Sequence, residues 1–296
     1  MPIGLKSPDW QCEQHDWPYA EHSRFVETRS HLWHVQRMGA GPQVLLIHGT
    51  GASTHSFADL LPELASRFDV MALDLPGHGF TRTNGLYPAT PRRVVEDIGY
   101  LLATEAFAPR IIVGHSAGAV IASCLGAMDV SDPALVVALN GAFRPFGGVA
   151  RVIAPVMAKA LYFNPLTSHA FAWSARNEER VRNLIAQTGS SIPERNIMFY
   201  QRLFQYPGHI SGALGLMANW DLEGIEEQIS QLRTPHLFLV GIDDRAVPPS
   251  NSERLAEVMS NAALVRLTGR GHLVHEEDPV AIAGHIRTAA SEHGVL

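Results

Sequence analysis

One pentapeptide constrains the fold of this chain more than any other stretch. Residues 111–113 are apolar and β-branched, residues 114–118 read Gly-His-Ser-Ala-Gly, and residues 119–122 are small or apolar. A strand, a sharp turn and a helix in this order are typical of a nucleophile elbow, which exposes a serine above the edge of a sheet. Glycines two before and two after Ser116 are expected where a Cβ would collide with the neighbouring strand or helix. The stretch therefore predicts a nucleophilic serine, if the chain also supplies a base, an acid and an oxyanion hole.

Buried strands alternate with helical patterns over the first half of the chain. The apolar runs of the buried parallel type are residues 44–47, 70–73, 111–113 and 135–139. This alternation predicts a doubly wound α/β sheet, in which functional residues gather at the carboxyl ends of the strands. The polar residues at those ends are His48, Asp74, Ser116 and Asn140.

The alternation stops between residues 144 and 233, where the pattern is helical, broken by prolines and rich in aromatic residues. It resumes with strands at 236–240 and 264–267 and a final helix from Pro279. We therefore predict a mostly parallel, eight-stranded sheet with an inserted helical cap. The predicted core comprises residues 1–143 and 234–296, and the predicted cap comprises residues 144–233. Residues 1–22 read as an irregular arm, and residues 23–38 as an antiparallel hairpin.

Composition excludes several classes of function. The 296 residues include 23 basic and 29 acidic side chains, a net charge of −6 that does not favour nucleic-acid binding. Two cysteines do not make a disulfide framework, so we expect a cytoplasmic protein. We see neither a signal peptide nor an apolar run long enough to span a membrane. The histidines are scattered without metal-ligand spacing, so we predict no metal and no cofactor.

A serine nucleophile needs a base and an acid that orients it. His272 follows a Gly-Arg-Gly turn after the last predicted strand and precedes the helix marked by Pro279, and His275 is the alternative base. Asp243 and Asp244 follow the strand at 236–240. The chain order of serine, aspartate and histidine is that of an α/β-hydrolase triad. The residues alone leave the choice between the two aspartates open.

An oxyanion hole needs two backbone N–H groups aimed at one point. The N–H of Ala117, directly after the serine, is the natural first donor. The loop at residues 48–51, His-Gly-Thr-Gly, follows the first parallel strand and offers the N–H of Thr50 as the second.

The predicted cap holds nine basic and seven acidic residues and many aromatic ones. Solvated helix faces and helix-on-helix packing explain such a composition. The alternative is a pocket for a flat apolar ligand that carries carboxylates, held by aromatic and arginine side chains. The apolar run at 152–157 is a candidate for contact with a membrane surface. The residues that we expect to line a substrate pocket are His48, His115, Phe143, Trp173, Tyr200 and Trp220.

Together these motifs resemble the α/β-hydrolase superfamily over nearly the whole chain. The matching stretches are residues 48–51, 74–79 (Asp-Leu-Pro-Gly-His-Gly), 114–118, 241–244 (Gly-Ile-Asp-Asp) and 271–272 (Gly-His). In that family the acid usually stands three residues after such a glycine and four before the proline, here Pro248. The resemblance therefore implies that Asp244, not Asp243, is the triad acid beside Ser116 and His272.

A narrower resemblance is to the magnesium-chelatase accessory family of bacteriochlorophyll biosynthesis (BchO). The stretches that carry it are residues 16–18, 23–26, 33–36, 48–56, 207–209 and 217–222. It implies a role near magnesium insertion into protoporphyrin IX, with this porphyrin or its magnesium form as ligand and chelatase subunits as partners. It also implies a cytoplasmic protein that can lie at the photosynthetic membrane. The alternatives are a non-catalytic porphyrin-binding or delivery protein, and an esterase or C–C hydrolase unrelated to pigments.

Overall fold

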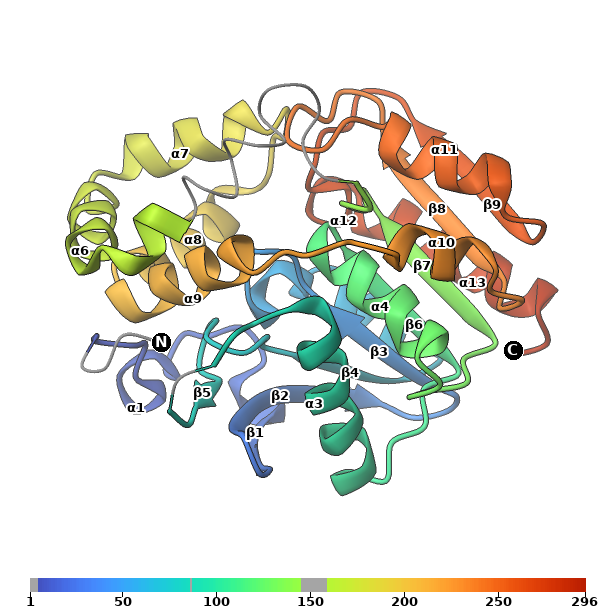
Figure 1. The fold of residues 1–296 in the computed structure, drawn as a ribbon, viewed down its shortest axis with the longest axis horizontal. Coiled ribbons are helices and arrows are strands. Elements are labelled where there is room, and N and C mark those ends of the chain that lie inside the picture. The colour runs from blue at the N-terminus through green and yellow to red at the C-terminus, as the bar shows by residue number, and fades with distance from the viewer. Residues whose placement is uncertain (1–4, 86, 145–158) are drawn as a thin grey trace.

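The computed structural model describes residues 5–85, 87–144 and 159–296 (Figure 1). One sheet runs through the molecule in the order β1-β2-β4-β3-β6-β7-β8-β9, and the short β5 pairs with β2. The strands are β1 (Ser23–Glu27), β2 (His31–Gly39), β3 (Gln43–Ile47), β4 (Asp69–Leu73), β5 (Arg82–Thr83), β6 (Ile111–His115), β7 (Leu135–Leu139), β8 (His236–Gly241) and β9 (Ala262–Leu267).

The sheet is parallel from β4 through β3, β6, β7 and β8 to β9, and β1, β2 and β5 join it antiparallel. The mostly parallel α/β sheet and the antiparallel hairpin are confirmed. The path holds the eight predicted strands, and β5 adds a ninth among the described residues. With two residues, β5 is too short to show a periodic pattern. β6, which carries the pentapeptide, lies at the centre between β3 and β7.

Helices cover both faces of the sheet. One buried cluster joins the sheet to α3, α4, α10 and α11, and a second joins it to α2 and α13. The helices are α1 (Trp10–Glu13), η1 (Ala20–His22), η2 (Thr54–Phe57), α2 (Leu60–Ala65), α3 (Pro91–Thr104), α4 (Ala117–Ala127), α6 (Pro165–Ser174), α7 (Glu178–Gln187), α8 (Glu194–Phe204), α9 (Pro207–Ala218), α10 (Ile225–Ser230), α11 (Ser250–Val258), α12 (Val274–Glu277) and α13 (Pro279–Glu292). Among the described residues, no helix is both long and apolar enough to cross a membrane.

Helices α6 to α9 of the predicted cap lie together at one side of the molecule (Figure 1). They share a small buried cluster that also includes Ala52 and Leu273 of the core. Helix α10, within the predicted cap range, packs on α4 instead, and its Ile225 and Ile229 join the core cluster. Trp17 anchors the N-terminal arm, because it is buried against Phe80 and α8. The run at 152–157 lies outside the described residues.

Candidate active site

The pentapeptide forms a strained turn between β6 and α4. Ser116 has φ 53° and ψ −114°, a conformation that costs a non-glycine residue free energy and is typical of functional sites. A Cβ added to Gly114 would lie 2.1 Å from the Gly118 carbonyl oxygen, and one added to Gly118 would lie 2.1 Å from that of Ile47. The expected need for both glycines is thus confirmed: β3, β6 and α4 approach too closely for any side chain.

His272 and Asp244 are hydrogen bonded. His272 Nδ1 lies 2.7 Å from Asp244 Oδ2, and both side chains are largely buried. Because a carboxylate only accepts, Nδ1 carries the proton and Nε2 is left as the basic nitrogen. Asp243 is exposed to solvent instead. Ser116 forms no hydrogen bond to His272 in this structure, and such bonds often tighten only when substrate is present.

Asn140 joins the candidate site, although its residue type and spacing predict no role for it. Its Nδ2 donates to Asp244 Oδ2 at 2.6 Å and to the Gly271 carbonyl at 2.9 Å. One amide therefore links the acid loop (residues 242–249, between β8 and α11) to the base loop (residues 268–273, between β9 and α12). Its Oδ1 accepts the N–H of Gly241 at 3.0 Å. In the sequence, its position directly after a predicted buried strand is the one feature that indicates a role. In the structure it adopts φ 46°. Asparagine tolerates this left-handed region better than most residues.

His115 holds the base loop from the other side. Its Nε2 lies 2.9 Å from the His272 carbonyl oxygen. Complete burial lowers the pKa of His115 well below its ordinary value, with the neighbouring His275 and His272 adding to the effect. The ring is therefore neutral, and its one proton lies on Nε2, because the carbonyl can only accept.

The loop after β3 approaches the elbow closely. A Cβ on Gly49 would lie 3.0 Å from Ser116 Cβ. Neither the Thr50 N–H nor the Ala117 N–H donates to another described residue, and their role as an oxyanion hole stays a prediction. The Gly51 carbonyl accepts a hydrogen bond from His209 Nε2 of α9 at 3.0 Å, which fixes this loop to a cap helix.

The link between α7 and α8 contacts both triad loops. Ser190 Oγ accepts the N–H of Leu273 at 2.8 Å, and the Thr188 carbonyl accepts the N–H of Arg245 at 3.0 Å. A Cβ on Gly189 would lie 2.1 Å from the Asp243 carbonyl oxygen. The cap therefore supports the loops that carry the acid and the base, a contact that no local sequence pattern signals.

His275, the alternative base, belongs to a separate buried network. Its Nε2 lies 2.7 Å from Ser56 Oγ, and burial lowers its pKa to about 3. Ser56 Oγ and Tyr200 Oη donate to Glu276 Oε1 at 2.6 and 2.7 Å, and Asn196 Nδ2 donates to Oε2 at 3.1 Å. Burial raises the pKa of Glu276 to about 7, although these three hydrogen bonds oppose the shift.

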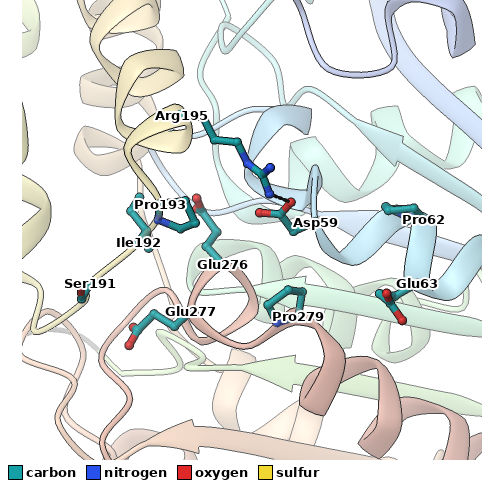
Figure 2. A pocket seen from close by; sticks show the side chains of 10 residues that line it. All are labelled: Asp59, Pro62, Glu63, Ser191, Ile192, Pro193, Arg195, Glu276, Glu277 and Pro279. Atoms are coloured by element: carbon teal, nitrogen blue, oxygen red, sulfur yellow. Dashed lines mark hydrogen bonds and ion pairs between the residues drawn. The ribbon is translucent and has the colours of Figure 1, made fainter.

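Helix α12 also borders a cavity of about 620 Å³ behind the base loop. Figure 2 shows Glu276 and Glu277 on one side of it and the Asp59–Arg195 ion pair on another. The Glu277 carboxylate accepts the N–H of Gly271 at 3.0 Å, so it supports the residue before His272. No cluster of three potential metal ligands occurs among the described residues.

The residues predicted to line a pocket lie in different surroundings. His48 is fully buried, and its Nε2 accepts the N–H of Leu75 at 2.9 Å. Phe143 packs against Phe238 in the core, and Trp220 is half-buried against the same cluster. Trp173 is 67% exposed on α6. His115 contacts the base loop and Tyr200 the Glu276 network, as described above. A role for these residues in a substrate pocket stays a prediction.

Comparison with known proteins gives the same fold. Residues 44–285 match the family described as "Alpha/beta hydrolase family". The magnesium-chelatase 30 kDa subunit of Rhodobacter capsulatus is 35% identical over 92% of this chain and 95% of its own. A pimeloyl-[acyl-carrier protein] methyl ester esterase of Chromobacterium violaceum is 30% identical over 86% of this chain and 98% of its own.

Solved structures agree at the level of the fold. An evolved variant of potato epoxide hydrolase has a TM-score of 0.76 at 19% identity, covering 91% of this chain and 99% of its own. A thermophilic esterase from Thermogutta terrifontis has a TM-score of 0.72 at 20% identity, covering 92% and 98%.

Proposed function

The chain belongs to the α/β hydrolase family, and from this premise we propose that it is a serine hydrolase acting on an ester-type carbonyl. Ser116 is the proposed nucleophile, His272 the base and Asp244 the residue that orients the base. The observation that carries the proposal is the 2.7 Å hydrogen bond from His272 to Asp244 on loops that meet at the strained Ser116 turn.

In the proposed reaction, His272 Nε2 takes the proton of Ser116 Oγ as this oxygen bonds to the carbonyl carbon. The N–H groups of Thr50 and Ala117 hold the resulting oxyanion. The imidazolium then gives its proton to the leaving alcohol as the ester bond breaks. A water molecule, activated by the same nitrogen, hydrolyses the acyl-enzyme and regenerates Ser116.

We further propose that this chemistry serves magnesium chelatase in bacteriochlorophyll biosynthesis. The similarity to the magnesium-chelatase 30 kDa subunit supports this role, because it extends over 92% of this chain and 95% of that subunit. A dicarboxylic porphyrin such as protoporphyrin IX, or its magnesium form, is the proposed ligand. The proposed setting is the cytoplasm, with peripheral contact to the photosynthetic membrane and with chelatase subunits as partners.

A second candidate is a non-catalytic protein that binds and delivers the porphyrin on a hydrolase scaffold. The name of the 30 kDa relative favours it, because that name states membership in a chelatase and not a hydrolysis. An esterase unrelated to pigments is the third candidate, and the similarity to a methyl ester esterase supports it.

Labelling with a fluorophosphonate probe tests the proposed chemistry. The wild type should be labelled at Ser116, and Ser116→Ala should not be labelled. Labelling of Ser116→Ala, or none of the wild type, would contradict a serine hydrolase. Both proteins should then be added to a magnesium-chelatase assay. If Ser116→Ala supports magnesium insertion as well as the wild type does, the delivery role is favoured over the catalytic one.

A further inference from the structure

A second cavity, of about 540 Å³, lies between the N-terminal arm and the cap helices. The N-terminal arm, α6, the end of α8 and the start of α9 surround it, through Lys6, Trp173, Arg202 and Tyr206 among other residues. None of the residues that line it belongs to the pentapeptide, the loop at 48–51 or the triad. The cavity is therefore separate from the candidate active site.

The cavity carries uncompensated positive charge. Arg202 forms ion pairs with Glu13, the one carboxylate that lines the cavity, and with Asp16 beside it. Lys6 and Arg176 also line it, and neither forms an ion pair with a described residue. The three cations against these two carboxylates leave one positive charge in excess, which favours an anionic ligand, and a guanidinium suits a carboxylate in particular.

The cavity also offers flat apolar surface. The Trp173 side chain lines the cavity and is 67% exposed, so its ring is accessible to a ligand. The Tyr206 ring also lines the cavity, with the Lys6 ammonium 5.5 Å from its centroid. Aromatic side chains of this kind stack on planar rings.

We propose that this cavity between the arm and the cap binds a planar aromatic carboxylate, its ring on Trp173 and its carboxylate on Arg176 and Lys6. This inference rests on the proposed function, which names a carboxylated ring compound as the ligand, and it adds the place where that compound binds. The carboxylated ring ligand then lies between the arm and the cap, at a distinct site from the one where Ser116 reacts.

The test titrates the full-length protein with protoporphyrin IX and, separately, with its uncharged dimethyl ester, and follows porphyrin fluorescence. Trp173→Ala and the double variant Lys6→Gln/Arg176→Gln should each weaken binding of the free acid by about tenfold or more. The ester should bind the wild type about as weakly as the acid binds the double variant. Arg254→Gln, which removes an exposed arginine from α11, is the matched control and should leave the dissociation constant unchanged.

Three outcomes would overturn the inference. The first is wild-type affinity in Trp173→Ala and in the double variant, and the second is equal affinity for acid and ester. The third is that the cavity variants lose binding only to vesicles containing anionic lipid, which would make this face a membrane contact. Trp173→Phe should retain most of the affinity and so separates loss of stacking from misfolding.

Fluorophosphonate labelling in the same variants separates this inference from the proposed function. The double variant Lys6→Gln/Arg176→Gln should be labelled at the wild-type rate. If labelling of Ser116 abolishes porphyrin binding while the cavity variants bind normally, the porphyrin lies over the triad and this inference fails alone. If Ser116 is never labelled but the cavity variants lose porphyrin, the proposed hydrolysis fails and this inference stands.

Discussion

The ring of His115, one residue before the proposed nucleophile, donates its Nε2–H to the backbone carbonyl of His272, the proposed base, at 2.9 Å. The elbow and the base loop are thus tied together by a side chain that lies beside the reacting atoms. A triad held within a few tenths of an ångström needs such support, because small displacements of a base cost much of the rate.

Replacing His115 by phenylalanine keeps an aromatic ring at this position and removes the hydrogen bond. We expect the rate of fluorophosphonate labelling to fall about tenfold to a hundredfold. The effect should appear in the labelling step and not in probe affinity. His236→Phe, which changes another buried histidine away from the triad, is the control for general loss of stability. An unchanged labelling rate in His115→Phe would show that the base loop holds its place without this bond.

Asn140 provides the second prediction, since its amide donates to Asp244 Oδ2 at 2.6 Å. Asn140→Asp replaces the donor by a second carboxylate beside Asp244, and two like charges at this distance disfavour the state in which both are ionised. We expect the labelling rate to fall about tenfold or more at pH 7 and its acidic limb to move to higher pH. Asn140→Ala should lower the rate without moving that limb. Equal pH profiles for the two variants would argue against the electrostatic role.

The sequence indicated much of this arrangement because strand ends converge. His48, Ser116 and Asn140 each follow an apolar run, and parallel strands bring such positions to one edge. Neither the contact of Asn140 with Asp244 nor that of Ser190 with Leu273 could be predicted. Both join residues more than 80 positions apart, and their partners are set by how loops and cap pack and not by local periodicity.

The placement of cap side chains was equally hard to predict. Tyr200 and Trp173 are both aromatic residues on helices with apolar neighbours, and the sequence treats them alike. In the structure one hydrogen bonds to buried Glu276 and the other is exposed beside Arg176. The difference depends on which face of each helix meets the core, which tertiary packing decides.

The glycines of the elbow provide a stability test. A methyl group on Gly118 would lie 2.1 Å from the Ile47 carbonyl oxygen, and a backbone atom in the sheet centre cannot move aside. We expect Gly118→Ala to lower the free energy of unfolding by about 3 kcal/mol or more, measured by urea denaturation. Gly284→Ala, in α13 with no atom within 4 Å of the added carbon, should instead gain up to about 1 kcal/mol. Similar losses in both variants would contradict the packing argument.

The buried carboxyl group of Glu276 should make the free energy of unfolding depend on pH. Burial raises its pKa from 4.5 to about 7, so between these values the folded protein keeps a proton that the unfolded chain has lost. The folded state then binds more protons, and the free energy of unfolding falls as the pH rises through this window. Glu276→Gln cannot ionise and should therefore gain about 2–3 kcal/mol relative to the wild type between pH 5 and pH 8.

Urea denaturation of the wild type and Glu276→Gln gives the difference between their free energies of unfolding. This difference should be larger at pH 8 than at pH 5 by the amount stated above. Glu257→Gln, on the exposed side of α11, changes the same group in solvent and should show a pH-independent difference.

Glu276 also links Tyr200 and Asn196 of cap helix α8 to Ser56 of the core. Ionisation above pH 7 places a charge in this buried site, and separation of α8 from the core exposes that charge to water. Helix α8 should therefore open first, seen as faster amide exchange in α8 than in α13. If α8 and α13 exchange faster in parallel, the effect of Glu276 is on global stability and not on the cap.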